Sequence, residues 1–439
     1  MNALRIATIA AVSAVATVSQ AQRTTPRPTT VTPARAELTD LPSGVSEETV
    51  RAHVASPAGL RAVRTEVNDE RERSYKLASA AKTFASTPHL DVSDFGLAMH
   101  SALKDKVAGY IFQVRHNGNL IHTGMWQWAQ TPSDQGKGWT VDTRMHVASV
   151  SKFLTAVGMV KLLDAKGIDY DTPIIDYLPT YWLKGPKIDQ ITFRRLLTHK
   201  SGFSTGTSTS TYMFMRLRVA VGVPAVGSYD YENMNFGLMR ILIPIINGDV
   251  SKSAMFSNDP LENSLKWDVV TLYHYRNYMQ ANVFSPAGVA NVQFHPVSGM
   301  ANALAYRLPA ESGEGWNSGN LEASAGGAAW RLSVKELLNV MDHVRRRNTI
   351  IPATTAQYML DNGFGIDQVL QSPAGKMYNK NGSWGADCVT DTNCKTEQSV
   401  AYFFPNGIEV AVFVNSPIGV EGFSLRNIVK DSYLNSLSQ

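Results

Sequence analysis

The sequence predicts a mixed α/β (α+β) fold, in which one antiparallel sheet carries an inserted helical lobe. Strands are predicted on either side of Asn117-Gly118 and again on either side of Pro405-Asn406-Gly407, and both turns are typical of β-hairpins. The long section 168–370 between them is mostly helical and rich in loops. Strands at both ends of the chain, with helices between them, indicate a single sheet from which a helical lobe extends.

Each predicted element has a local signal. The hairpin strands alternate or run apolar, as half-buried and fully buried strands do; they are Tyr110–Val114, Leu120–Trp128, Val400–Phe404 and Glu409–Asn415. A helix is predicted over 266–281, and an amphipathic helix over 423–437 closes the chain.

The composition is that of a globular protein. The 439 residues are 18% charged and 44% apolar, which is enough for a large core and two lobes. The net charge is +4, and no basic stripe interleaved with aromatic residues is present. Nucleic-acid binding is therefore not expected.

Residues 1–21 resemble a secretory signal peptide. Arg5 gives a positive start, Ile6–Val18 is apolar but too short to span a bilayer, and Ser19-Gln20-Ala21 is a small-x-small cleavage site. The alternative is an N-terminal anchor, but the weakly hydrophobic Ala/Thr-rich core favours cleavage. No other stretch is a transmembrane candidate, so the protein is expected to be secreted or periplasmic.

Three further segments are predicted after the signal peptide. Residues 22–45 form a linker rich in Thr and Pro, 46–92 a helical N-terminal extension on the surface, and 93–439 the folded domain. The two cysteines, Cys388 and Cys394, lie in an Asp/Thr/Asn-rich loop. In an oxidising compartment we expect them to form a disulfide that contributes roughly 2 kcal/mol. Without a nearby histidine they make a poor zinc site, and no metal is expected.

The stretch from Val147 to Lys152 carries the strongest chemical signal. Residues 153–163 are apolar on nearly every side, as in a buried helix, and Gly167 supplies a left-handed stop. If the helix begins near Ser149, then Ser149 and Lys152 share one face at its N-terminus. An amine held against a serine in a dry pocket can activate that serine as a nucleophile, which indicates acyl-transfer chemistry.

Short patterns recur by chance, so context must choose among them. Ser-x-x-Lys, Tyr-x-Asn and Lys-x-Gly occur at Ser79/Lys82, Ser101/Lys104 and Ser149/Lys152, at Tyr231/Asn233, Tyr275/Asn277 and Tyr433/Asn435, and at Lys200/Gly202 and Lys380/Gly382. Ser79 and Ser101 lie in polar helical stretches, and Tyr275 and Tyr433 are better explained as packing residues. Tyr231, in contrast, lies between a loop and a helix. Lys380-Asn381-Gly382 precedes hairpin strands, so it can lie on a sheet edge.

In this order the motifs resemble those of the serine β-lactamase-related family, which includes class C β-lactamases, D-alanyl-D-alanine carboxypeptidases and esterases of the same fold. The resemblance covers roughly 95–435 and includes Ser149-Val150-Ser151-Lys152, Tyr231-Glu232-Asn233, Lys380-Asn381-Gly382, Ile191–Leu197 with Thr198-His199-Lys200-Ser201-Gly202, Phe284-Ser285-Pro286-Ala287-Gly288 and Ala325-Gly326-Gly327. It implies a β-lactamase/penicillin-binding-protein-like fold and a serine hydrolase domain over 93–439. Glu232 stands where Ser or Ala is usual, and Asn381 where Thr is common in lactamases. These departures bear on the substrate more than on the chemistry.

The chemistry suggests a role for each motif residue. Ser149 attacks a carbonyl, and its proton goes to Tyr231 or Lys152. Both have reference pKa values near 10, so one must be lowered, and the cations Lys152 and Lys380 around a phenol would favour phenolate. We therefore favour Tyr231 as the base, with Lys152 tuning it. Asn233 would bond the substrate or Lys152, and Lys380 would offer its charge to a substrate carboxylate or to the phenolate.

The remaining site residues surround the third motif. The oxyanion hole is expected to consist of the backbone N–H groups of Ser149 and Ser383. Asn381, Gly382 and Trp384 are predicted to contact the substrate, Trp384 as a wall of the pocket. His199 is interpreted as a hydrogen-bonded structural residue at a helix end.

The sequence thus predicts a serine hydrolase that forms an acyl-enzyme on Ser149 and hydrolyses ester or amide bonds of small-molecule or peptide-like acyl substrates. No metal or organic cofactor is expected. A D-alanyl-D-alanine carboxypeptidase or a β-lactamase is the close alternative, and a catalytically silent ligand-binding member is a further one. A Ser-His-Asp hydrolase is disfavoured, because the one Gly-x-Ser-x-Gly pattern, at Gly202–Gly206, lies in a stretch rich in Ser, Thr and Gly and not in a strand-to-helix turn. The natural substrate, the leaving group and the oligomeric state stay open.

Overall fold

The fold is taken from a computed structural model of the chain. The structure describes residues 38–55, 86–205, 210–310, 313–390, 393–419 and 424–438. The predicted signal peptide 1–21, linker residues 22–37 and Ser79 lie outside these residues.

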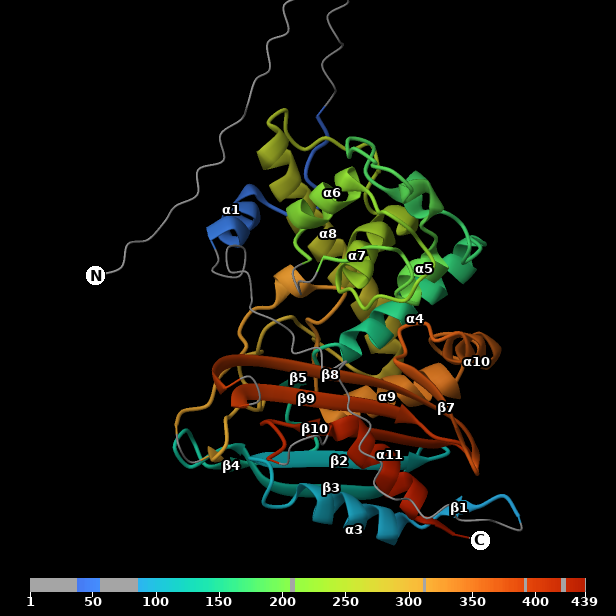
Figure 1. The fold of residues 1–439 in the computed structure, drawn as a ribbon. Helices are drawn as coiled ribbons and strands as arrows, with labels where there is room; N and C mark the ends of the chain where they lie inside the picture. The colour runs from blue at the N-terminus through green and yellow to red at the C-terminus, as the bar shows by residue number, and fades with distance from the viewer. Residues whose placement is uncertain are drawn as a thin grey trace, which may run out of the picture. The chain divides into compact units, whose positions relative to one another are not determined.

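The fold is built on a seven-stranded antiparallel sheet (Figure 1) with the strand order β4-β3-β2-β10-β9-β8-β7. Its strands are β2 (Gly109–His116), β3 (Asn119–Gln130), β4 (Lys137–Gly138), β7 (Gln368–Ser372), β8 (Gly375–Thr390), β9 (Asn393–Phe403) and β10 (Ile408–Val414). β2 and β10 are adjacent, with Val114 opposite Val410. The predicted union of early and late strands in one antiparallel sheet is therefore confirmed.

Both predicted hairpin turns have the backbone that their sequences favour. Asn117 and Gly118 have φ values of 51° and 78°, and Asn406 and Gly407 have 57° and 73°. Positive φ at two successive residues matches the right-handed twist of the strands that they join. The four predicted hairpin strands are β2, β3, β9 and β10.

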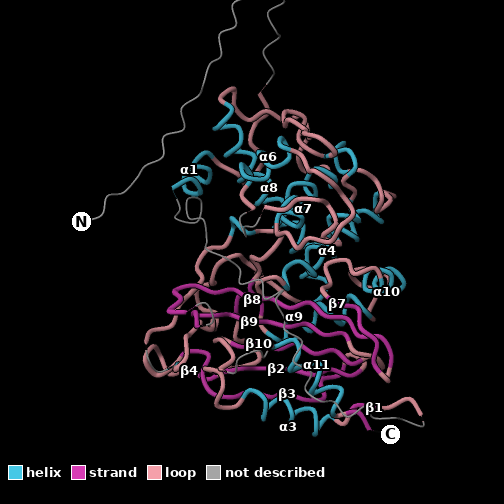
Figure 2. Tube along the Cα trace, in the orientation of Figure 1, coloured by secondary structure: helices cyan, strands magenta, loops and turns pink. Residues whose placement is uncertain are grey.

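Helices cover both faces of the sheet (Figure 2). α3 (Val92–Leu103) and α11 (Leu425–Asn435) pack on one face, where Phe95, Val412 and Val429 share a core cluster. α4 (Val150–Lys166), α9 (Val334–Arg345) and α10 (Ala353–Asp361) belong to the other side, whose core includes Phe153 and Phe403. The short pair β1 (His89–Leu90) and β11 (Leu437–Ser438) lies beside α3 and α11 in sequence.

The helical lobe leaves and rejoins the sheet region at one short ladder. β5 (Met145–His146) pairs with β6 (Arg331–Leu332), so the insertion is bounded by two neighbouring strands. After α4, the described helices and turns between these strands are η1 (Ile174–Tyr177), η2 (Ile188–Gln190), α5 (Phe193–Leu197), α6 (Tyr212–Val221), α7 (Met234–Asn247), α8 (Pro260–Met279), the π-turn η3 (Gln280–Phe284), η4 (Ser285–Ala287) and η6 (Glu322–Ser324). The predicted interval 168–370 is longer, because α9 and α10 follow β6 and α9 contacts β2 and β10. α8 begins before the predicted 266 because Asp259 caps it and Pro260 occupies its first turn.

Part of the predicted N-terminal extension is helical and docked. α1 (Glu47–Ala55) lies against α8, where Glu47 pairs with Lys266 at 2.5 Å. Val45 and Val50 are buried in the core cluster that also contains Phe153 of α4. The predicted surface helix therefore contributes to packing as well.

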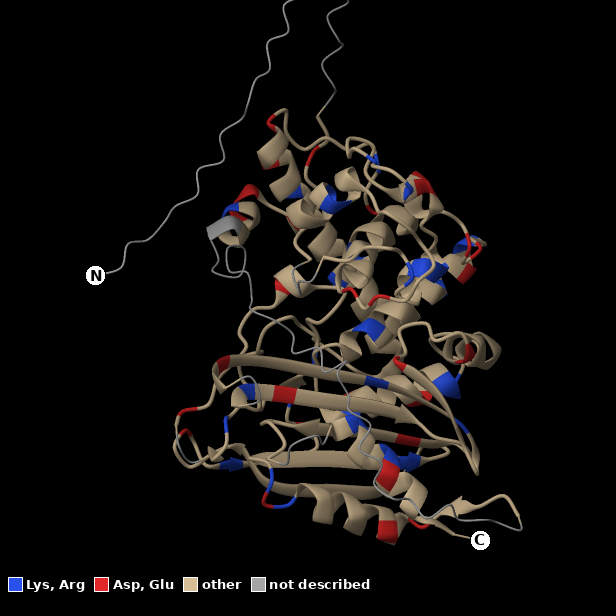
Figure 3. Cartoon of the chain, viewed as in Figure 1, with Lys and Arg blue, Asp and Glu red and all other residues tan. Residues whose placement is uncertain are grey.

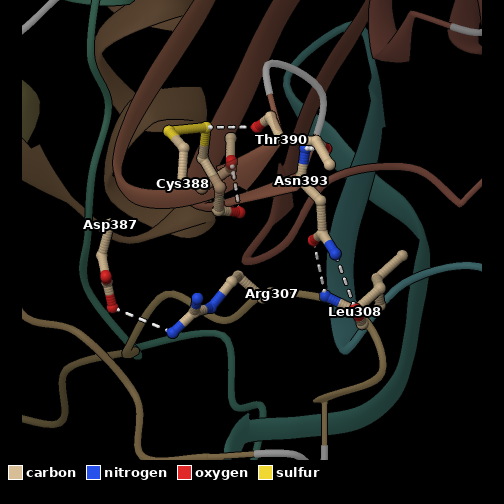
Figure 4. The surroundings of a disulfide bond; sticks show 8 residues. Arg307, Leu308, Asp387, Cys388, Thr390 and Asn393 are labelled. Carbon is tan, nitrogen blue, oxygen red and sulfur yellow. Dashed lines mark hydrogen bonds and ion pairs between the residues drawn. A yellow bond between two sulfur atoms is a disulfide. The ribbon is translucent and has the colours of Figure 1, made fainter.

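The two cysteines form the predicted disulfide, at the tip of the long β8–β9 hairpin (Figure 4). The segment predicted as a loop is largely strand, because β8 continues to Thr390 and β9 begins at Asn393. Asn393 accepts a hydrogen bond from Leu308 N at 3.0 Å, which fastens the tip to the neighbouring segment.

Charged residues of both signs are interspersed over the helices and strands (Figure 3). Within the described ranges, no helix is both long enough and apolar enough to cross a membrane.

Candidate active site

Ser149 stands at the start of the buried helix α4. It is the N-cap residue, and its side chain makes no capping hydrogen bond. Ala148, directly before it, has a φ of 44°, an uncommon backbone conformation for a residue with a Cβ atom. α4 is buried along most of its length and ends at Gly167, which has a φ of 65°. The predicted start and stop of this helix are confirmed.

Lys152 lies one helical turn after Ser149 and is fully buried. Its Nζ donates hydrogen bonds to Ser149 Oγ at 2.8 Å, to Gly327 O at 3.0 Å and to Asn233 Oδ1. Three acceptors around one ammonium group offset the cost of burying its charge. Of the two roles predicted for Asn233, the structure shows the bond to Lys152.

Tyr231 completes a chain of polar contacts around the serine. Its hydroxyl donates to Ser149 Oγ at 2.8 Å. Two ammonium groups lie near the ring, with Lys152 Nζ 4.8 Å and Lys380 Nζ 4.9 Å from its centroid. Tyr231 lies in the loop two residues before Asn233, the N-cap of α7, so the start of that helix positions Asn233 and the loop leading into it carries Tyr231.

The ring of His199 packs against the ring of Tyr231, a contact that the sequence did not predict. The two rings stack with centroids 4.4 Å apart. His199 Nδ1 accepts a hydrogen bond from Glu232 N at 3.1 Å. Burial of the ring, together with the charges of Lys380 and Lys152, holds the pKa of His199 well below its usual value. A neutral imidazole that packs on Tyr231 fits the predicted structural role and gives it a specific partner.

Glu232, which departs from the family pattern, is engaged by a different segment. Its carboxylate accepts hydrogen bonds from Thr205 N at 2.7 Å and Thr205 Oγ1 at 2.6 Å. Glu232 is buried, at 3% exposure. It therefore ties the segment before residue 206 to the loop that carries Tyr231.

Lys380 lies at the point where β8 becomes an edge. β7 pairs with β8 only up to Gln368 and Asn379. The next backbone N–H on that side of β8, that of Asn381, binds the Asp367 carboxylate at 3.0 Å. Lys380 Nζ donates to Tyr231 Oη at 3.3 Å and to Asp367 Oδ1 at 2.5 Å. Asp367 was not predicted, since only the register of β7 on β8 brings it to Lys380.

Gly382 brings the backbone of β8 against the start of α4. A Cβ atom added at Gly382 would lie 2.5 Å from Val147 O and 2.8 Å from Ser149 N. Only a residue without a side chain permits this approach. Ser383 follows directly, so its backbone lies one residue from the contact.

Two predicted substrate contacts lie elsewhere. Asn381 Oδ1 accepts a hydrogen bond from Arg426 of α11 at 3.1 Å, and α11 packs on the face of the sheet opposite α4. Side chains alternate along a strand, so Asn381 lies on the opposite face from Lys380. The structure does not bring its side chain to Ser149.

Trp384 is also displaced from its predicted role as a pocket wall. It is 1% exposed and packs edge-on against His146, with ring centroids 5.3 Å apart. It is part of the core on the α4 side of the sheet. Its large apolar surface is therefore used for packing.

In the part of the chain that the structure describes, no group of three or more His, Cys, Asp or Glu side chains is arranged to hold a metal ion. The groups gathered around Ser149 are instead a phenol, two amines, an amide and backbone atoms. Such a set supports nucleophilic attack by serine with proton transfer to a neighbouring base.

Comparison with known proteins agrees with this arrangement. The family model described as beta-lactamase matches residues 97–430. Beta-lactamase-like protein 4 of Dictyostelium discoideum is 23% identical over 253 residues, which are 52% of this chain and 41% of that protein. The chain thus matches less than half the length of this relative.

Solved structures share the fold. The D-amino acid amidase from Ochrobactrum anthropi SV3, solved with L-phenylalanine amide, has a TM-score of 0.56 and 16% identity, over 78% of this chain and 98% of that chain. EstCE1, described as a hydrolase with promiscuous acyltransferase activity, has a TM-score of 0.55 and 15% identity, over 78% of this chain and 99% of that chain. Since the family model covers most of the chain, this protein belongs to the beta-lactamase family.

Proposed function

We propose that the protein is a serine hydrolase that forms an acyl-enzyme on Ser149 and cleaves ester or amide bonds of small acyl substrates. The observation that carries the proposal is the position of Ser149 Oγ, which lies 2.8 Å from both Tyr231 Oη and Lys152 Nζ. A weak nucleophile needs a base within hydrogen-bond reach, and this serine has two candidates.

In the proposed mechanism, Tyr231 acts as phenolate. Two ammonium groups within 5 Å of its ring favour the charged form of the phenol. Tyr231 then takes the proton of Ser149 as Oγ attacks the carbonyl carbon. The C–O bond to Ser149 forms, and the negative charge moves to the carbonyl oxygen.

The next steps use the same groups. The backbone N–H groups of Ser149 and Ser383 are proposed to stabilise the oxyanion. As the tetrahedral intermediate collapses, the bond to the leaving group breaks and Tyr231 returns its proton to that group. A water molecule then attacks the acyl carbon and gives one proton to Tyr231. The C–O bond to Ser149 breaks, Tyr231 returns that proton to Ser149 Oγ, and the carboxylic acid product leaves.

Relatives of the same fold support small acyl substrates. EstCE1 is described as a hydrolase with promiscuous acyltransferase activity, and the protein from Ochrobactrum anthropi SV3 is a D-amino acid amidase. Acyl transfer and amide hydrolysis both pass through attack on a carbonyl carbon. We therefore extend ester or amide hydrolysis to this chain as a proposal.

We also propose that the protein is exported, to the periplasm or beyond the cell. Its motivation is the signal-peptide pattern of residues 1–21 together with the Cys388–Cys394 disulfide. Structural disulfides form and persist mainly in oxidising compartments.

Active-site labelling tests the proposed nucleophile. A fluorophosphonate probe should label the wild-type protein on Ser149, and Ser149→Ala should lose the label. Ser101→Ala is the matched control, since Ser101 heads another Ser-x-x-Lys pattern but lies in α3, and it should be labelled like wild type. Labelling of Ser149→Ala at the wild-type level would contradict the assignment.

The reaction itself is tested with purified protein and three substrates: a p-nitrophenyl ester, a chromogenic cephalosporin and a D-Ala-D-Ala peptide. Ester hydrolysis that is lost in Ser149→Ala is the expected result. Turnover of only the cephalosporin or only the peptide would select the lactamase or the carboxypeptidase. If none is hydrolysed and no label is taken up, the protein is a silent binding member.

A further inference from the structure

A buried ion pair at Lys380 bears on which substrates the site accepts. Lys380 Nζ lies 2.5 Å from Asp367 Oδ1, and the two side chains are 2% and 11% exposed. Lys380 also donates to Tyr231 Oη at 3.3 Å. Asp367 is therefore bound to the same ammonium group that contacts the proposed base.

The backbone around Asp367 fixes its carboxylate in place. Its own N–H donates to Asn379 O at 2.8 Å, which continues the β7–β8 pairing by one residue. Its Oδ2 accepts the backbone N–H of Asn381 at 3.0 Å. One oxygen is thus held by β8 while the other faces Lys380, so the carboxylate cannot leave the ammonium group without losing a strand contact.

Charge bookkeeping around Ser149 shows what this carboxylate changes. Lys152 and Lys380 each contribute one positive charge, and ionised Tyr231 contributes one negative charge. Without Asp367, these three groups would sum to one positive charge, which would attract an anionic substrate. When ionised Asp367 is added, the four groups sum to zero. An incoming carboxylate would then meet an oxygen anion that is already bound to Lys380.

A further cation, Arg426, contacts Asp367 from the opposite face of the sheet. Its Nη1 lies 3.8 Å from Asp367 Oδ2 and donates to Asn381 Oδ1 at 3.1 Å. Arg426 belongs to α11, which packs on the face of the sheet opposite α4. Its charge is therefore directed at Asp367 and Asn381.

Building on the proposed hydrolase function, we propose that Asp367 is a specificity-determining residue that makes the site select acyl substrates without a carboxylate next to the scissile bond. Lys380 then stabilises the ionised phenol of Tyr231, and Asp367 balances the charge of Lys380 before substrate binds. Neutral esters and amides are the expected substrate class. Substrates that end in a free carboxylate beside the reacting carbonyl are disfavoured.

The test compares two aryl esters that are identical except for one meta-carboxylate on the leaving group, which is free in one and methyl-esterified in the other. Wild-type protein should have the higher kcat/KM for the methyl-esterified compound. Asp367→Asn removes the charge with little change of shape and should move the ratio of the two kcat/KM values toward the carboxylate by about tenfold or more.

Asp387→Asn is the matched control. It removes the same charge from β8, the strand that Asp367 contacts, but Asp387 is bound to Arg307 and Lys395 near the disulfide (Figure 4). Its substrate ratio should stay at the wild-type value. An unchanged ratio in folded Asp367→Asn, or an equal change in Asp387→Asn, would overturn the proposal.

A second measurement uses wild-type protein alone, so it does not depend on the variant folding. Phenylboronic acid and 3-carboxyphenylboronic acid both offer boron to a nucleophilic serine. The carboxylated compound should inhibit more weakly, and equal or stronger inhibition by it would refute the role of Asp367. If neither boronate inhibits and neither ester is hydrolysed, the hydrolase function itself fails, which is a separate result.

Discussion

The contact between Gly382 and the start of α4 offers the sharpest test of the proposed site. We predict that Gly382→Ala impairs catalysis while leaving the fold in place. The added Cβ would lie 2.5 Å from Val147 O, 2.8 Å from Ser149 N and 2.9 Å from Ser399 Oγ. Ordinary van der Waals contact begins near 3.4 Å, so β8 and α4 would have to separate by roughly 0.6 to 0.9 Å.

A separation of that size is large for an oxyanion hole. Its donors must lie about 2.7–3.1 Å from the developing charge, and loss of one donor typically lowers kcat by about 10²–10³-fold. Since the displacement moves the backbone of Ser149 relative to that of Ser383, we expect kcat to fall by about 100-fold. KM should change less, because the oxyanion forms only in the transition state.

The assay is steady-state hydrolysis of a neutral p-nitrophenyl ester, with circular dichroism to confirm that each variant is folded. Gly385→Ala is the matched control on the same strand, because its added Cβ would come no closer than 3.3 Å to Cys394 Cβ and 3.5 Å to Lys395 O. It should keep near wild-type kcat. If folded Gly382→Ala stays within about threefold of wild type, the reasoning about the oxyanion hole is wrong.

Three other predictions address the base, a buried carboxylate and the disulfide. Tyr231→Phe should lower acylation by about 10²–10⁴-fold, and Lys380→Ala should lose clearly less on a neutral ester; near-full activity of Tyr231→Phe would move the base to another residue. Glu409 is buried, with a pKa raised by burial from 4.5 to about 7. Glu409 binds its proton more tightly in the folded protein than in the unfolded chain. The free energy of unfolding should therefore fall by about 3 kcal/mol as the pH rises from 4.5 through about 7. Urea unfolding should find Glu409→Gln more stable than wild type at pH 8 but not at pH 4, and equal stabilities at pH 8 would count against the raised pKa. Mass spectrometry of non-reduced exported protein should show a Cys388–Cys394 peptide lighter by two hydrogens, whereas two free thiols would contradict the disulfide.

Local chemistry allowed the sequence to determine the framework. The Asn117-Gly118 and Asn406-Gly407 turns were predictable because positive φ at two adjacent residues favours Asn and Gly. The buried helix after Ser149 was predictable because residues 153–163 are apolar around the whole helix and Gly167 can stop it. The serine and lysine at its start then follow from helical spacing alone.

The tertiary structure decided the contacts between distant segments. Asp367 reaches Lys380, and His199 stacks on Tyr231, only after strands and helices take their register. Nothing near either residue in the sequence encodes its partner, because such contacts depend on how remote elements pack.

Register also decided which side chains face the site. Along β8, a change of one residue exchanges one face for the other, so Lys380 faces Tyr231 while Asn381 meets Arg426 on the far face. Trp384 shares the face of Lys380, yet its ring fills the core beside His146. The sequence by itself determined the chemical groups and their order, and the packing of β8 against α4 decided which of them meet Ser149.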